Sequence, residues 1–243
     1  MQSWGLTDVG CVRKQNQDAF HIEKLDRHSL LAVVCDGMGG AKSGNVASSL
    51  AVDVFVQEVT RNWTSQTDWD KCDMILRSAV KLANFTVYDQ ACQFEEFSGM
   101  GTTLVAAVIR KNQASIINVG DSRCYVITNG SIRQVTKDHS VVQMMVDRGD
   151  LTPETAKTFP GKNLITRAVG TEPTILSDIY RQDLEKGSFL FLCSDGLSNM
   201  LDDQEILFEV VHGVKKQNCC KRLLNIAKMR GSPDNVTSIL VSV

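Results

Sequence analysis

The chain has 243 residues, with 26 lysines and arginines against 28 aspartates and glutamates, and its formal net charge is −2. This balance excludes a nucleic-acid-binding protein that works through bulk positive charge. The longest apolar runs, such as residues 30–35, are far shorter than the roughly 18 residues of a membrane-spanning helix, so we expect no membrane insertion. The first residues show no basic stretch followed by an apolar one, and we expect a cytoplasmic protein.

The cysteines support the same compartment. The chain has 8 cysteines and no C-x-x-C pair. A chain of this length can bury its own core, so a disulfide framework is not expected. Cys35 and Cys193 lie within apolar runs, where a free thiol packs as a small hydrophobic side chain. We therefore expect free thiols in a reducing cytosol, and no zinc site.

The first third of the chain reads as short extended runs separated by turns, ending in an apolar strand over 30–35. Apolar residues at helical spacing then predict a helix over 43–61, with Ser43 as its N-cap. A second helix is predicted over about 68–93. Four segments rich in β-branched residues follow, at 102–109, 114–119, 124–128 and 131–135.

The last two of these strands are predicted to form a hairpin through Asn129-Gly130, because both positions tolerate positive φ. Residues 139–180 are mixed, with a helix start near 152–154 and a break at 159–161. A strand over 188–193, helices near 202–212 and 216–229, and a strand over 236–243 complete the chain. This segregation predicts an α+β fold with helices outside antiparallel sheets. Since no stretch reads as a linker, we expect one domain over 1–243.

Two buried strands end in the same dipeptide, at Asp36-Gly37 and at Asp195-Gly196. Either copy alone is typical of a turn, in which Asp bonds its own backbone and Gly accepts positive φ. Two copies also deliver two carboxylates from rigid strand ends, where scaffolds hold catalytic groups. Both interpretations stay open at this point.

Several signatures of hydrolases and nucleotide-binding proteins are missing. The sequence has no G-x-x-x-x-G-K-[ST] loop, no G-x-S-x-G elbow, no Cys followed six positions later by Arg, and no H-E-x-x-H pair. Five aspartates instead end extended runs in Gly-, Pro- or Asn-containing surroundings. Carboxylates are preferred ligands of Mg²⁺ and Mn²⁺, and such a group could hold two ions about 3.5–4 Å apart. The five are Asp18, Asp36, Asp121, Asp195 and Asp234.

Six short segments stand in order along the chain: 10–18 (GCVRKQNQD), 36–40 (DGMGG), 99–104 (GMGTTL), 119–123 (VGDSR), 194–197 (SDGL) and 234–237 (DNVT). Residues 137–140 (KDHS) and 163–168 (NLITRA) accompany them. In this order and spacing the set resembles the metal-dependent protein phosphatase family, the protein phosphatase 2C type, in its bacterial form. The resemblance runs from about residue 3 to the last strand.

The resemblance implies a four-layer α/β/β/α sandwich, with two antiparallel sheets face to face and helices outside each. Residues 139–180 would form a flap subdomain beside the site. The implied activity is hydrolysis of phosphoserine and phosphothreonine on phosphorylated proteins, opposing a cognate Ser/Thr protein kinase. The implied cofactors are two Mn²⁺ or Mg²⁺ ions, and the third, weaker ion of bacterial members.

Residue roles follow from the same resemblance. Asp36 would bridge two metals, and the Gly37 carbonyl would ligate the second of them. Asp195 and Asp234 would hold the first metal. Asp121, together with Asp195, would ligate the third. A hydroxide bridging the metals would attack phosphorus directly, without a covalent phosphoenzyme.

Two residues beside the metals complete the expected site. Arg13 would bind the substrate phosphate through its planar fork of donors, and Asp18 would orient metal-bound water from outside the ligand set. The leaving oxygen has no evident proton donor, since relatives place a His where this chain has Met38 or Ala41. We expect a metal-bound water near Asp121 to supply that proton.

Two other function classes stay open. One is a catalytically inactive relative that binds phosphoproteins or a partner, and the other is a metal-binding structural module. A relative without activity would have lost metal ligands, whereas all five aspartates are present here, which favours the enzyme.

Overall fold

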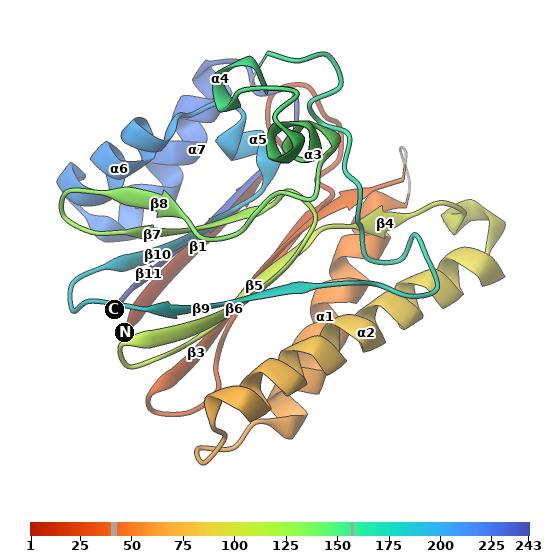
Figure 1. Cartoon of the computed structure of the whole chain (residues 1–243), viewed down its shortest axis with the longest axis horizontal. Coiled ribbons are helices and arrows are strands. Elements are labelled where there is room, and N and C mark those ends of the chain that lie inside the picture. The colour runs from red at the N-terminus through yellow and green to blue at the C-terminus, as the bar shows by residue number, and fades with distance from the viewer. Residues whose placement is uncertain (40–42, 157) are drawn as a thin grey trace.

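The computed structural model describes residues 1–39, 43–156 and 158–243. Two antiparallel sheets pack face to face (Figure 1). In the first sheet the strand order is β1 (Gln2–Asp8), β11 (Val236–Ser242), β10 (Phe189–Cys193), β7 (Arg123–Ile127) and β8 (Ile132–Gln134). In the second it is β2 (Asp18–Lys24), β3 (Ser29–Met38), β5 (Leu104–Arg110), β6 (Gln113–Val119) and β9 (Asp178–Asp183), with the short β4 (Gly101–Thr102) paired to β3.

Helices cover the outer face of each sheet (Figure 1). α1 (Gly44–Asn62) and α2 (Trp69–Gln93) pack on the second sheet, and α5 (Asp195–Ser198), α6 (Asp203–His212) and α7 (Cys219–Met229) pack on the first. The predicted four-layer α+β sandwich is therefore confirmed. Two short 3₁₀ turns, Glu95–Phe97 and Lys216–Asn218, precede β4 and α7.

Three apolar layers separate these four layers of structure, and β3 shows how one strand serves two of them. Leu31 and Val33 face α1 and α2, whereas Ala32 and Val34 face the other sheet. Successive side chains of a strand point to opposite faces, so a strand buried on both sides reads as one continuous apolar run. This is why residues 30–35 were recognisable as a strand.

The predicted helices over 43–61 and 68–93 are confirmed as α1 and α2. Ser43 precedes α1, but it does not cap the helix through its side chain: its Oγ donates to the Gly39 carbonyl at 2.6 Å. α2 has a true side-chain cap, because the Asp68 carboxylate accepts from the Lys71 N–H at 2.8 Å. Ser43 is thus the N-cap residue of α1, as predicted, and its backbone carbonyl accepts from the Ala47 N–H at 3.0 Å, but its side chain does not make the cap hydrogen bond.

The hairpin through Asn129-Gly130 forms, and the Thr128 N–H closes it by donating to the Ser131 carbonyl at 2.9 Å. Neither residue 129 nor 130 has positive φ, so the reason given for the hairpin is wrong. The left-handed conformation occurs instead at Lys111, in the β5–β6 turn, with φ of 53°.

The 139–180 segment holds two short helices, α3 (Val141–Arg148) and α4 (Pro153–Ala156), and returns through irregular chain to β9. β9 was not predicted, because as an edge strand it is polar and partly exposed along its length. The helices lie over the end of the sandwich where α5 begins (Figure 1).

Candidate active site

Four of the five predicted aspartates come to one end of the sandwich because strand ends place them there. Asp18 opens β2 and pairs in register with Asp36 near the end of β3. Asp195 directly follows the β10 strand and begins α5, and Asp234 lies just before β11. β10 and β11 are neighbours in the other sheet, so the two sheets contribute two carboxylates each.

Asp18 links the two sheets. Its Oδ2 accepts from the Ser194 hydroxyl at 2.8 Å and from the Thr237 hydroxyl at 2.6 Å, both of which belong to the other sheet's strand ends. Its Oδ1 is buried and has no hydrogen-bond partner. Burial, with smaller contributions from repulsion by Asp195 and Asp234, raises the pKa of Asp18 to about 7.

Asp36 is held through its backbone by the Gly-Thr-Thr segment. The Asp36 N–H donates to the Thr103 hydroxyl at 2.9 Å, and the Asp36 carbonyl accepts from the Thr103 N–H and the Thr102 hydroxyl, each at 2.9 Å. Burial first, and then repulsion by Asp18, raises the pKa of Asp36 well above its ordinary value. The segment at 99–104 therefore serves to fix one carboxylate.

Asp121, from the β6–β7 loop, joins this group. Burial first, and then repulsion by Asp195, raises the pKa of Asp121 to about 8. The Ser122 and Thr103 hydroxyls bond at 2.7 Å and hold the loop to the chain beside Asp36. Asp195 Oδ2 accepts from the Asn199 side-chain amide at 3.0 Å, and its Oδ1 is a second buried carboxylate oxygen without a hydrogen-bond partner among the described residues.

Arg13 lies at the rim, in the loop between β1 and β2. Its Nη2 donates to Asp234 Oδ2 at 2.8 Å, and its side chain is 52% exposed. The loop itself is fixed by Asn235, whose Nδ2 donates to the Val9 carbonyl at 2.9 Å and the Gln15 carbonyl at 3.0 Å. The structure thus places Arg13 beside the carboxylates with its guanidinium still open to solvent.

The glycines of the two Asp-Gly pairs are needed for close approach. Neither Gly37 nor Gly196 has positive φ. A Cβ on Gly37 would lie 2.0 Å from the Gly44 carbonyl oxygen, and one on Gly196 would lie 1.9 Å from the Asn235 carbonyl oxygen. The interpretation of both pairs as turns is therefore wrong.

The chemistry of the group fits a hard divalent cation. Carboxylates are buried together with raised pKa values, two of their oxygens have no hydrogen-bond partner among the described residues, and Arg13 at the rim pairs with Asp234. Within residues 1–39, 43–156 and 158–243, however, no three acidic, His or Cys side chains stand in ion-holding geometry. Asp234 is bonded to Arg13 and Asp195 to Asn199, so a ligand set requires these side chains to exchange partners.

A pocket of about 870 Å³ opens beside these carboxylates. Asp121 and Asp195 form part of its wall, and further lining comes from α3, α4, α5 and the start of α6, and from Arg123 and Asp138. The flap segment and the first sheet's helices therefore enclose the space next to the site.

Sequence reasoning did not assign roles to the polar residues that hold the aspartates. They are Thr102, Thr103, Ser194, Asn235 and Thr237, and each lies inside a segment that carried the family resemblance. Met38 lies at the end of β3, where some relatives have a His. Gly40 and Ala41 lie outside the described residues.

The sequence model of the protein phosphatase 2C family matches residues 12–225. The chain is 35% identical to the serine/threonine phosphatase stp of Listeria welshimeri, over 97% of this chain and 93% of that protein. It is 35% identical to the protein phosphatase PhpP of Streptococcus pneumoniae, over 98% and 96% of the two chains. The crystal structure of Stp1 from Staphylococcus aureus, a serine/threonine phosphatase, matches with a TM-score of 0.92 at 36% identity, covering 100% of this chain and 95% of that one.

The chain belongs to the protein phosphatase 2C family. The enzyme class predicted from the sequence segments, a protein serine/threonine phosphatase of this metal-dependent family, is thereby confirmed. Among the helices in the described part of the chain, none is long and apolar enough to cross a membrane.

Proposed function

We propose that this chain hydrolyses phosphoserine and phosphothreonine on proteins, using two Mn²⁺ or Mg²⁺ ions and a third, weaker one. The observation that carries the proposal is the convergence of buried aspartates from both sheets, among which one oxygen of Asp18 and one of Asp195 have no hydrogen-bond partner in the described part of the chain. A catalytic centre for phosphate esters needs such a group to bind cations, and the cations in turn attract a phosphate dianion.

The roles we propose follow the positions of the side chains. Asp36, at the centre of the group, would hold two of the ions, and the Gly37 carbonyl, one residue on, would contribute to the second. Asp195 and Asp234, from the other sheet, would hold the first. Asp121, which borders Asp195 on the pocket side, completes the third site with it.

When bound, the ions would supply Lewis acidity to the phosphoryl oxygens and lower the pKa of the water that attacks phosphorus. The protein's own groups prepare this step. Arg13 is exposed enough to turn from Asp234 to a phosphate oxygen without leaving the site. Asp18, fixed by Ser194 and Thr237, keeps one free oxygen to orient water at the site.

The pocket beside Asp121 and Asp195 supports a protein substrate, because its volume of about 870 Å³ leaves room for residues that flank a phosphorylated side chain. The relatives from Listeria and Staphylococcus are serine/threonine phosphatases. We propose phosphorylated proteins made by a cognate Ser/Thr kinase as substrates. All eight cysteines are free, as the reducing cytoplasm we propose as its location would keep them.

The test is phosphate release from a phosphothreonine peptide and from p-nitrophenyl phosphate, with and without Mn²⁺. Wild type should require the metal, and Asp36→Asn and Asp195→Asn should abolish release. Asp183→Asn, which changes an exposed aspartate at the far end of β9, is the matched control and should remain active.

The same assay separates the alternatives. Peptide binding without phosphate release would indicate an inactive binding protein. Mn²⁺ binding with no release and no peptide binding would indicate a structural metal site. Full activity in both Asp→Asn variants would contradict the proposed centre.

A further inference from the structure

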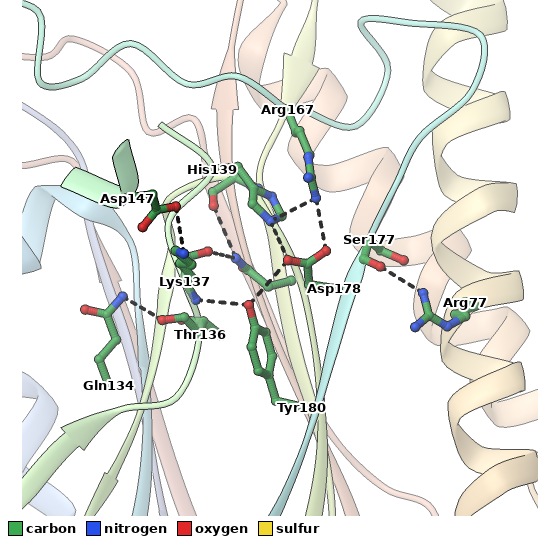
Figure 2. A network of polar contacts seen from close by, with 12 residues as sticks. Arg77, Gln134, Thr136, Lys137, His139, Asp147, Arg167, Ser177, Asp178 and Tyr180 are labelled. Atoms are coloured by element: carbon green, nitrogen blue, oxygen red, sulfur yellow. Dashed lines mark hydrogen bonds and ion pairs between the residues drawn. The ribbon is translucent and has the colours of Figure 1, made fainter. Parts of the chain in front are cut away.

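His139 is a buried residue outside the aspartate group, and both of its ring nitrogens are engaged. Its side chain is 6% exposed, and it lies between the β6–β7 loop and the chain that returns from the flap segment to β9. Figure 2 shows it at the centre of a polar network with Arg167, Asp178 and Tyr180. The segment KDHS, which the proposed mechanism does not use, contains it.

The contacts fix the tautomer of His139. The Gly120 N–H donates to His139 Nδ1 at 3.1 Å, so Nδ1 carries no proton. The proton of the neutral ring is therefore on Nε2, which lies 3.3 Å from Asp178 Oδ2 and 3.2 Å from Arg167 Nη1. A guanidinium has no acceptor, so Nε2 donates to Asp178. Arg167 donates to the other oxygen of Asp178 at 3.0 Å and holds that carboxylate in place. Burial lowers the pKa of His139, which agrees with a neutral ring.

His139 holds both backbone groups of Gly120. Besides the ring contact to the Gly120 N–H, the His139 N–H donates to the Gly120 carbonyl at 2.9 Å. On its other side Gly120 has no space, because at its φ of 102° a Cβ would lie 2.6 Å from a Thr103 methyl carbon. The residue that follows Gly120 is Asp121. The backbone that aims the Asp121 carboxylate is therefore confined between Thr103 and His139.

We infer that His139 is a positioning residue for Asp121. Its neutral ring, oriented by Asp178, fixes the backbone from which the Asp121 carboxylate reaches the site, and so sets the affinity of the divalent site that Asp121 completes. The inference rests on the proposed role of Asp121. His139 acts through Gly120 and touches neither substrate nor metal.

Two near-isosteric substitutions separate the two contacts of the ring. The amide oxygen of His139→Asn can take the place of Nδ1 and keep the Gly120 contact, but it cannot reach Asp178. The amide nitrogen of His139→Gln can take the place of Nε2 and keep the Asp178 contact, but it leaves the Gly120 N–H without an acceptor. If Gly120 is what matters, His139→Gln should be the more damaging of the two.

The measurement is Mn²⁺ titration of the full chain by calorimetry. We expect His139→Gln to raise the Kd of the weakest Mn²⁺ site by about tenfold, the lower end of what groups supporting metal ligands contribute, and to leave the tighter sites unchanged. His139→Asn should raise it less. Amide hydrogen exchange at residues 119–123 should be faster in His139→Gln than in wild type.

Two further variants make the result decisive. In Asp121→Asn, which removes the carboxylate being positioned, adding His139→Gln should change no Mn²⁺ affinity further. Asp178→Ala, at a partly exposed site, releases the ring without opening a core cavity and should shift the weakest site in the same direction. This variant decides the question if His139→Gln does not fold.

Wild-type Mn²⁺ affinities in folded His139→Gln and in Asp178→Ala would overturn the inference. So would an equal loss of affinity with and without Asp121, because that would show a general structural effect. Failure of the proposed function is seen elsewhere, in the peptide assay on wild type and Asp36→Asn, so the two failures are distinguishable.

Discussion

Two neighbouring regions of the molecule bury charge in opposite ways. Arg123 and Asp138 form a pair through Nε and Nη2, with the shortest contact at 2.7 Å and exposures of 28% and 10%, and Gln134 donates to the same carboxylate. The aspartates at the strand ends, which border this pair at Asp121, have Arg13 at the rim as their paired cation. The first region is neutral within the fold, whereas for the second we propose cations from outside.

The largest expected effect is that of Asp36→Asn on activity. Removing the central carboxylate should lower kcat by roughly 10³-fold, equivalent to about 4 kcal/mol of transition-state stabilisation. The metal-free variant should unfold at a higher temperature than metal-free wild type, because it loses a buried like charge. Steady-state kinetics and calorimetry measure the two quantities. Lower stability together with lost activity would contradict this view of the region.

Removing one partner of the Arg123–Asp138 pair should lower the stability of the protein, whereas Asp36→Asn should raise that of the metal-free protein. Arg123→Met leaves the Asp138 carboxylate nearly buried without its cation, and should lower the free energy of unfolding by about 2–3 kcal/mol, reduced from the fully buried case because Arg123 is partly exposed. Urea denaturation measures this. The double change Arg123→Met with Asp138→Leu should recover most of the loss, and a double variant no more stable than the single one would refute the assignment.

The stability of the metal-free protein should fall as pH rises. The pKa values of Asp18 and Asp121 are raised to about 7 and about 8, so between about pH 4 and pH 8 the folded state holds protons that the unfolded chain has lost. We expect the free energy of unfolding to decrease continuously across that window.

Saturating Mn²⁺ should remove this decrease, because divalent ions bind the ionised carboxylates. Denaturation at several pH values, with EDTA and with Mn²⁺, measures both curves. A flat curve in EDTA would show that the aspartates are already compensated within the fold.

The smallest expected effect is that of a substitution that lies in neither of the two regions. Asp68→Ala removes the N-cap of α2, at the surface of the second sheet's helix layer, and should lower the free energy of unfolding by about 1 kcal/mol. Activity and Mn²⁺ affinity should stay at wild-type values. A change in Mn²⁺ affinity here would mean that the assays report general destabilisation.

The central elements could be predicted because their side-chain pattern is set by burial alone. The strand at 30–35 and helices α1 and α2 each bury one or two apolar faces, and the pattern is visible in the sequence. β9 was not predicted from the sequence, because an edge strand with polar residues has no such apolar pattern. The Ser43 hydroxyl bonds to the Gly39 carbonyl, and the spacing of apolar residues does not show such a contact.

Only some residues of the candidate site could likewise be predicted from the sequence. The aspartates could be selected because each ends an extended run, but their convergence came from the resemblance and not from composition. The roles of Thr103, Ser194 and Thr237, whose hydroxyls bond to Asp36 or Asp18, could not be predicted. A hydroxyl at a strand end is equally typical of a side chain that is exposed to solvent. The role of each depends on the register between two sheets, which no single segment encodes.

Mn²⁺ binding at equilibrium shows whether the strand-end aspartates take up external cations. Calorimetric titration of the metal-free full chain at neutral pH should show at least two Mn²⁺ ions bound by wild type and fewer by Asp36→Asn, while Asp183→Asn matches wild type. Binding of no Mn²⁺ by wild type, or equal binding by wild type and Asp36→Asn, would contradict the proposal that they do.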